Sequence, residues 1–289
     1  MSKIGILTDS CCDMPQELAD KYQIDILCIP VLLEGKTYIE RQDMTNDQFY
    51  NMMRQAEGVP TTAAITPIQY CEKYCEYLDK NYTDLLVVTL NSGGSSTYNN
   101  ALSGIKMLEE EHPGHKLNIQ VVDSHTYSMV QGWPLVQAAR KLRNGAELKM
   151  VIAELNQAYA QMEVCLAAFS LKQMKKSGRI SAAAAFVGEL LGLRPIISLN
   201  DGISKVESKV RGDAAVIPAM IKYCQSRADM NMVEYGLGYT DGDRIKELKK
   251  QAKKAFGHEP AYLFQLGAAV SSNTGPDAIA ITFPGIARR

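Results

Sequence analysis

One strand-turn-helix unit in the first half constrains the fold of this 289-residue chain more than any other feature. The apolar run at residues 84–90 predicts a buried strand, and apolar residues at helical spacing predict a helix over 99–111. The turn between them is rich in glycine and hydroxyl groups. Glycines let a ligand approach the backbone, and a helix N-terminus supplies free N–H groups and partial positive charge. The unit therefore favours a site for a small anionic group at the end of this strand.

A helix cap without any ligand is the alternative for the same turn. In that arrangement the hydroxyl of Ser96 or Thr97 would accept hydrogen bonds from N–H groups of the first helical turn. The motif alone does not separate the two interpretations, so both stay open at this point.

Strand and helix signals alternate along the rest of the first half. Predicted strands cover residues 3–8, 24–31, 84–90 and 118–122, and helices are predicted between them. Residues 32–40 are predicted to complete a hairpin around Gly35, and capping boxes are predicted at Thr45 and Thr66. This alternation predicts an α/β fold with a doubly wound parallel sheet. In such sheets ligands bind outside the carboxyl ends of the strands. Polar turns follow three of the strands at those ends, at Asp9-Ser10, at residues 91–97 and at Asp123-Ser124.

The second half carries a different pattern. Asn200-Asp201-Gly202 separates two extended stretches and is typical of a β-hairpin. Asp213 is predicted to cap a helix that ends near residue 227. Further strands are predicted over residues 164–169, 234–239, 262–270 and 278–283. The pattern indicates an α+β domain with a largely antiparallel sheet, so we expect two domains, residues 1–162 and 163–289.

Composition excludes several classes of protein. With 46% hydrophobic and 22% charged residues, the chain is typical of a folded globular protein. The net charge of −1 gives no electrostatic basis for binding nucleic acid or an anionic membrane surface. No apolar run approaches the roughly 20 residues of a membrane span, and the acidic Asp9 comes too early for a signal peptide. We therefore expect a cytoplasmic protein.

The motifs for metals and nucleotides are incomplete. The seven cysteines are expected to be reduced structural thiols, and the pair Cys71 and Cys75 lacks both a second pair and a nearby histidine. Pro30 stands where a phosphate-binding P-loop requires a glycine, and Asp241 where the dinucleotide fingerprint requires one. We predict no metal site and no cofactor.

No pair of nucleophile and base can be identified in the sequence. Ser92 and Ser95 lie outside a Gly-x-Ser-x-Gly motif, and no histidine has a context that marks it as their base. We therefore predict no catalytic residues. An enzyme acting between the domains, either a serine hydrolase that uses Ser92 or a small-molecule transferase, remains the alternative.

The alanine-rich segment at residues 181–192 is apolar on nearly every face. Such a segment is typical of a helix buried between two layers of structure. The alternative is a wall for an apolar ligand, because small alanine side chains leave room that leucines would fill.

Several short motifs follow one another in a specific order along nearly the whole chain. They are Thr8-Asp9-Ser10 with Asp13-Met14-Pro15, Thr61-Thr62 before Thr66-Pro67, the turn at 90–98, Val122-Asp123-Ser124, Ser177-Gly178-Arg179-Ile180, Arg194-Pro195 with Val210-Arg211, and Gly275-Pro276. Each motif is weak alone. The ordered set resembles the DegV family, which includes the fatty-acid-binding subunits of bacterial fatty acid kinase.

The resemblance implies both a fold and a function. A long-chain fatty acid would lie between the two domains with its tail buried. A separate kinase subunit with its own ATP site would phosphorylate the presented carboxylate, so this chain would need neither a cofactor nor a catalytic site. Arg179 and Arg211 would lie near the head group or where the kinase docks. The residues expected around the fatty acid carboxylate are Thr61, Thr62, Ser92, Gly93 and Asn273.

The chain departs from the family pattern at several of these positions. Ala63 and Ala64 stand where the family has Ser-Gln, Asn273 where it has a histidine, and Asp277 where it has a glycine. Asparagine can donate a hydrogen bond but is not cationic near neutral pH. Asp277 would repel a carboxylate if it faced the site. A regulatory or scaffold protein with an unused cavity is therefore a third interpretation.

Overall fold

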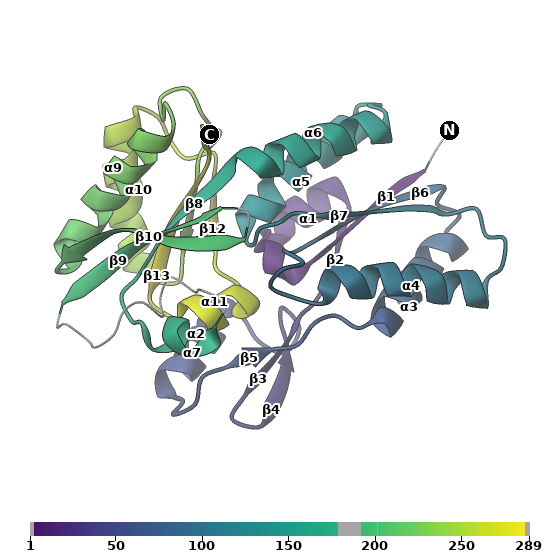
Figure 1. Ribbon diagram of the computed structural model, residues 1–289, viewed down its shortest axis with the longest axis horizontal. Coiled ribbons are helices and arrows are strands. Elements are labelled where there is room, and N and C mark those ends of the chain that lie inside the picture. The colour runs from purple at the N-terminus through teal and green to yellow at the C-terminus, as the bar shows by residue number, and fades with distance from the viewer. Residues whose placement is uncertain (1–2, 179–191, 201, 287–289) are drawn as a thin grey trace.

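The computed structural model describes residues 3–178, 192–200 and 202–286. Two large β-sheets lie next to each other, and a small third sheet lies beside the junction between them (Figure 1). The first half of the chain forms one large sheet and the small sheet, and the second half forms the other large sheet.

The first large sheet is parallel, as the alternation of strand and helix signals predicted. Its spatial order is β2-β1-β6-β7, and every neighbouring pair of strands is parallel. Its strands are β1 (Ile4–Asp9), β2 (Ile24–Leu27), β6 (Asp84–Thr89) and β7 (Asn118–Asp123). The carboxyl ends of β6 and β7 are in register at Thr89 and Asp123, so the polar turns that follow these strands are neighbours.

Side chains alternate between the two faces of this sheet because successive residues of a strand point to opposite sides. Ile6, Leu86 and Val88 belong to the core under one layer of helices, α1 (Gln16–Tyr22), α5 (Met129–Arg143) and α6 (Leu148–Gln161). Leu7 and Val87 belong to the core under α3 (Pro67–Asp79) and α4 (Thr97–Glu111). Figure 1 shows these two layers on either side of the sheet.

The small sheet follows the order β4-β3-β5 and packs against α2 (Asn46–Gln55). Its strands are β3 (Pro30–Leu33), β4 (Lys36–Ile39) and β5 (Thr61–Thr62). The expected hairpin around Gly35 forms, and so do both predicted capping boxes, at Thr45 and Thr66. The single strand expected over residues 24–31 is wrong, because it divides between two sheets near Ile29, whose N–H donates to Ser10 Oγ at 2.9 Å.

The second large sheet has the order β10-β9-β8-β13-β11-β12. It is antiparallel except for the parallel pair β11 and β12, which confirms a largely antiparallel sheet. Its strands are β8 (Met162–Ala168), β9 (Leu193–Asn200), β10 (Ile203–Arg211), β11 (Gly236–Tyr239), β12 (Tyr262–Gln265) and β13 (Ala278–Pro284). The helices of this half include α7 (Lys172–Ser177), α9 (Val216–Arg227), α10 (Gly242–Phe256) and α11 (Ala268–Thr274).

Three expectations for the second half need comment. The strand expected over 262–270 ends at Gln265, and α11 follows because the N–H groups of Gly267 and Ala269 find acceptors in the first half of the chain. Asp213 does not cap α9; its carboxylate instead accepts hydrogen bonds from Arg194 and Arg244. The expected helix at 182–191 lies outside the described residues.

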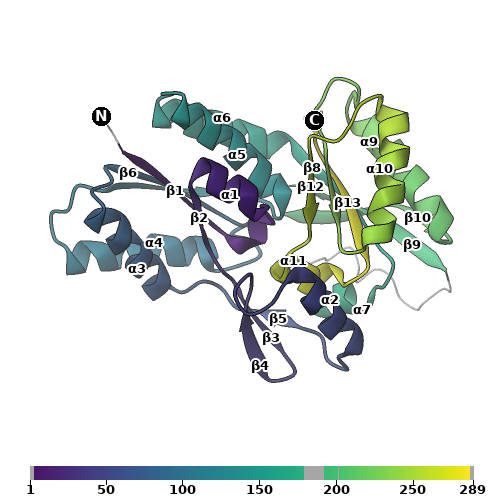
Figure 2. The same cartoon turned by 180° about the vertical axis from the view of Figure 1, so that it is seen from behind.

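Direct contacts join the two halves of the chain. The rings of Trp133 on α5 and Tyr262 on β12 stack with centroids 4.3 Å apart. The Tyr50 hydroxyl on α2 donates to the Leu266 carbonyl at 2.5 Å. Helix α11 lies at the junction, next to α2 and α7, as Figure 2 shows from behind. Among the described residues, no helix combines the length and the apolar character needed to cross a membrane.

Candidate functional site

A cavity of about 250 Å³ lies between the two halves of the chain. Its polar lining comes from β5, from the turns after β6 and β7 and from α11, and includes Thr62, Ser95, Ser96, Tyr127, Asn273 and Thr274. Its apolar lining comes largely from the second sheet and the start of α11, and includes Val164, Leu166, Leu199, Leu266, Val270 and Ala280. The cavity therefore offers hydrogen-bonding groups and an apolar surface to the same ligand.

The turn after β6 brings the N-terminus of α4 to this cavity. Ser96, at the N-cap position, makes no side-chain capping hydrogen bond. The Ser95 hydroxyl instead accepts from the Thr97 N–H at 3.2 Å and lies 2.9 Å from the Thr97 hydroxyl. The expected capping of α4 by the Ser96 hydroxyl is therefore absent from the structure. Ser95 and Ser96 both line the cavity, at the positive end of a 15-residue helix.

Tyr127, which the sequence did not single out, completes the polar lining. It lies in the turn after β7, and its hydroxyl accepts a hydrogen bond from Asn91 Nδ2 at 3.0 Å. A Cβ at Gly94 would lie only 2.1 Å from the Tyr127 oxygen, so a larger residue at position 94 would push the Tyr127 hydroxyl out of this place. The only sequence signal for Tyr127 was its position just after the polar Asp123-Ser124 turn.

The structure brings some of the predicted carboxylate-binding residues to the cavity and not others. Thr62 and Asn273 line it, whereas Thr61, Ser92 and Gly93 are not among its lining residues. The Ser92 N–H donates to the Asp123 carboxylate at 3.2 Å, and the Gly93 N–H donates to Asn91 Oδ1 at 3.0 Å. Both N–H groups therefore already have partners. The roles of Thr61, Ser92 and Gly93 toward a fatty acid remain predictions.

The amide of Asn273 is partly engaged within its own helix. Its Nδ2 donates to the Ala269 carbonyl at 2.9 Å. Asp277, which would have repelled a carboxylate, is not among the cavity-lining residues and forms an ion pair with Arg54 at 3.0 Å. The Arg54 guanidinium also donates to the Pro276 carbonyl at 3.0 Å. The charge of Asp277 is therefore balanced away from the cavity.

Arg211, one of the two predicted arginines, is not among the residues that line this cavity. Arg211 is exposed and pairs with Leu193 at the start of β9. Leu199, the β9 residue that lines the cavity, is six positions further along the strand, or about 20 Å at the usual rise per residue. Arg211 is thus well separated along the strands from this lining residue, and its expected place near the head group or where the kinase docks stays a prediction. Arg179 lies outside the described residues.

Two buried carboxyl groups from the first half hold the start of α11. Asp13 accepts a hydrogen bond from the Gly267 N–H at 2.8 Å and another from the Ser128 hydroxyl. Glu40 accepts from the Ala269 N–H at 3.0 Å and from the Ser10 hydroxyl. Burial raises the pKa of both acids above the ordinary value. Because α11 carries Asn273 and Thr274, these acids fix one wall of the cavity.

A third buried acid, Asp9, positions the turn after β6. It accepts hydrogen bonds from the Leu90 N–H at 2.7 Å and the Cys11 N–H at 3.1 Å. Leu90 and Cys11 both line the cavity. Burial raises the pKa of Asp9 from 3.8 to about 7, against the lowering effect of these hydrogen bonds.

This raised pKa predicts how stability depends on pH. Between pH 4 and pH 7 the folded protein holds a proton on Asp9 that the unfolded chain has released, so the Asp9 contribution favours folding in acid and is lost as the pH rises to about 7. Asp9→Asn should flatten the pH dependence of the unfolding free energy in this window, by at most about 4 kcal/mol. Urea titrations at several pH values measure the unfolding free energy of both proteins. The same change of this free energy with pH in wild type and Asp9→Asn would contradict the raised pKa of Asp9.

Comparisons with known proteins find similar proteins over nearly the whole chain. A family model described as "Uncharacterised protein, DegV family" matches residues 3–284. A DegV domain-containing protein from Caldanaerobacter subterraneus subsp. tengcongensis is 28% identical over 285 residues, covering 98% of this chain and 99% of the relative.

Two solved structures share the fold over nearly the whole chain. One is described as showing fatty acid binding of a DegV family protein from Thermus thermophilus. It has a TM-score of 0.86 at 26% identity and covers 98% of this chain and 100% of the other. The second is a stearic acid-binding protein from Eubacterium ventriosum, with a TM-score of 0.90 at 22% identity and coverage of 99% and 98%.

Proposed function

The chain belongs to the DegV family, and from that premise we propose that it binds a long-chain fatty acid in the cavity between its two halves. The observation that carries the proposal is the two-sided lining of this cavity, with hydroxyl groups and a helix N-terminus facing apolar strand residues. The fatty-acid-binding relative from Thermus thermophilus shares the fold over its whole length.

The lining suggests how a fatty acid would be oriented. The carboxylate would accept hydrogen bonds near Thr62 and Ser95, close to the N-terminus of α4. The acyl tail would extend along the apolar side chains of the second sheet, such as Leu166 and Leu199. Burial of a methylene group contributes about 0.8 kcal/mol, so the tail would supply most of the affinity and the polar end would set the direction.

We propose further that the bound carboxylate is presented to a partner kinase for acyl phosphate formation. In that reaction the kinase would transfer the terminal phosphoryl group of ATP to a carboxylate oxygen.

The alternative of a hydrolase has little support: no histidine lines the cavity within the described part of the chain. The Cys11 thiol does line it, but burial raises the pKa of Cys11 well above the ordinary value and keeps the thiol protonated.

The polar end is tested by two neighbouring threonines. Thr62→Ala should weaken fatty acid binding about ten- to a hundredfold, because a hydrogen bond to a desolvated carboxylate is worth roughly 1.5–3 kcal/mol. Thr61→Ala is the matched control, since adjacent residues of β5 point to opposite sides and only Thr62 lines the cavity. Titration with a fluorescent fatty acid measures both. Unchanged binding by Thr62→Ala would place the carboxylate elsewhere.

The presenter role predicts a division of labour between two proteins. The purified chain should not hydrolyse acyl esters and should not consume ATP. With a fatty acid kinase catalytic subunit, ATP and a bound fatty acid, it should yield acyl phosphate, detected by trapping with hydroxylamine. ATPase activity in the isolated chain would contradict this role and favour an enzyme.

A further inference from the structure

Two cysteines and one glutamate meet between α3 and α4, on the face of the first sheet away from α5 and α6. Cys71 and Cys75 lie one helical turn apart on α3, and Glu111 is the last residue of α4. The ligand atoms of all three lie within 4.8 Å of one another. In sequence the two cysteines had no partner group, and it is the packing of α4 on α3 that supplies Glu111.

The spacing of these groups suits a tetrahedral metal ion. At a zinc–sulfur distance of 2.3 Å, two tetrahedral sulfur ligands lie about 3.8 Å apart. The three groups are therefore within a rotamer adjustment of that geometry. Two ligands four residues apart on one helix can reach the same ion, because residues i and i+4 lie on one face.

The surroundings of the cluster leave room for a positive charge. Cys71 is only 2% exposed, Cys75 is half-buried, and Glu111 is exposed, so the cluster opens toward solvent on the Glu111 side. None of the ion pairs found among the described residues involves Glu111. A water molecule could complete the coordination from the open side, as in zinc sites with three protein ligands.

We propose that Cys71, Cys75 and Glu111 bind one thiophilic divalent cation of the zinc class, which links α3 to α4. Thiolate ligands favour soft and borderline ions over Mg²⁺ and Ca²⁺, which prefer oxygen. On binding, the two thiols release their protons to solvent and the carboxylate supplies the third bond. The site is independent of the fatty acid cavity, whose lining contains none of the three residues.

The test uses Co²⁺ as a spectroscopic substitute for Zn²⁺. The full chain is reduced, freed of metal with a chelator and titrated with Co²⁺ in the presence of a non-thiol reductant. The expected result is a thiolate-to-cobalt charge-transfer band that saturates at one ion per chain. Zn²⁺ should displace the Co²⁺ and raise the melting temperature by at least about 3 °C.

Variants assign the signal to the cluster. Cys71→Ser and Cys75→Ser should each lose most of the band, and Glu111→Gln should weaken binding about tenfold or more. Because Cys71 lies in the core, Cys75→Ser is the variant to rely on if Cys71→Ser does not fold.

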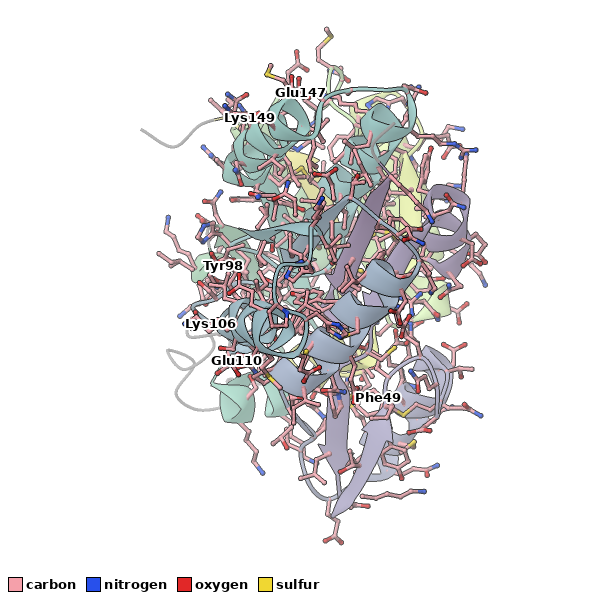
Figure 3. All side chains as sticks on the ribbon, turned by 90° about the vertical axis from the view of Figure 1, so that its right-hand side faces the viewer. Phe49, Tyr98, Lys106, Glu110, Glu147 and Lys149 are labelled. Carbon is pink, nitrogen blue, oxygen red and sulfur yellow. The ribbon has the colours of Figure 1, made fainter. Side chains whose placement is uncertain are left out.

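Two control variants replace a thiol and an acid that resemble those of the cluster but lie outside it. Cys28→Ser removes another partly buried thiol, and Glu110→Gln removes an acid on the outer side of α4, where Figure 3 shows it beside Lys106. Both controls should bind Co²⁺ as the wild type does. No charge-transfer band in the wild type, or a band that survives in Cys75→Ser, would overturn the proposal.

Discussion

Replacing Asp13 by alanine is expected to lower the free energy of unfolding by about 3–5 kcal/mol. The substitution leaves the buried Gly267 N–H and the Ser128 hydroxyl without an acceptor, at roughly 1–3 kcal/mol each. It also places alanine at a φ of 51°, in the left-handed region that favours asparagine, aspartate and glycine. Urea unfolding followed by the fluorescence of Trp133, the single tryptophan, measures the change.

Asp13→Asn is the matched control for this prediction. Asparagine tolerates the same backbone conformation and keeps one oxygen that can accept the Gly267 hydrogen bond. Its cost should be about 1–2 kcal/mol, clearly below that of alanine. If the free energy of unfolding of Asp13→Ala is within about 1 kcal/mol of the wild-type value, the hydrogen bonds between Asp13 and the start of α11 do not stabilise the protein as expected.

Filling the cavity from its rim should remove fatty acid binding without unfolding the protein. Ala64 lines the cavity but is only half-buried, so a larger side chain there does not have to enter a packed core. In Ala64→Trp the indole would occupy space for roughly four methylene groups of the ligand, a loss of about 3 kcal/mol. The affinity should therefore fall by about a hundredfold or more.

Ala64→Ser separates the volume of the side chain from the position itself. Serine adds one atom and should bind a fluorescent fatty acid within about threefold of the wild type. Thermal unfolding of both variants should stay close to that of the wild type. Full binding by Ala64→Trp would mean that the acyl chain does not use this cavity.

The parts of the fold that were predictable rest on local patterns. The parallel sheet, the hairpin at Gly35 and the two capping boxes each depend on residues within one or two elements. The end of β12 depends instead on Asp13, which lies 254 residues away from its hydrogen-bond partner Gly267. The N–H groups of Gly267 and Ala269 have acceptors in the first half of the chain, and no pattern within residues 262–270 records those distant partners.

The sequence was enough to predict which turns form the candidate site, but not which residues of those turns line the cavity. The turn after β6 does reach the cavity, but through Ser95 and Ser96 rather than Ser92. Which of two adjacent threonines faces the cavity depends on how a two-residue strand joins β3, which no local pattern records. Tyr127 reaches the site only because β6 and β7 are neighbours in register.

The central claim is that this protein carries a fatty acid between its two halves, and mass spectrometry under non-denaturing conditions tests it most directly. The purified wild-type chain, incubated with a mixture of long-chain fatty acids, should show an added mass equal to one fatty acid. Ala64→Trp under the same conditions should show the mass of the polypeptide alone. A wild-type protein that remains free of fatty acid after this incubation would contradict the claim.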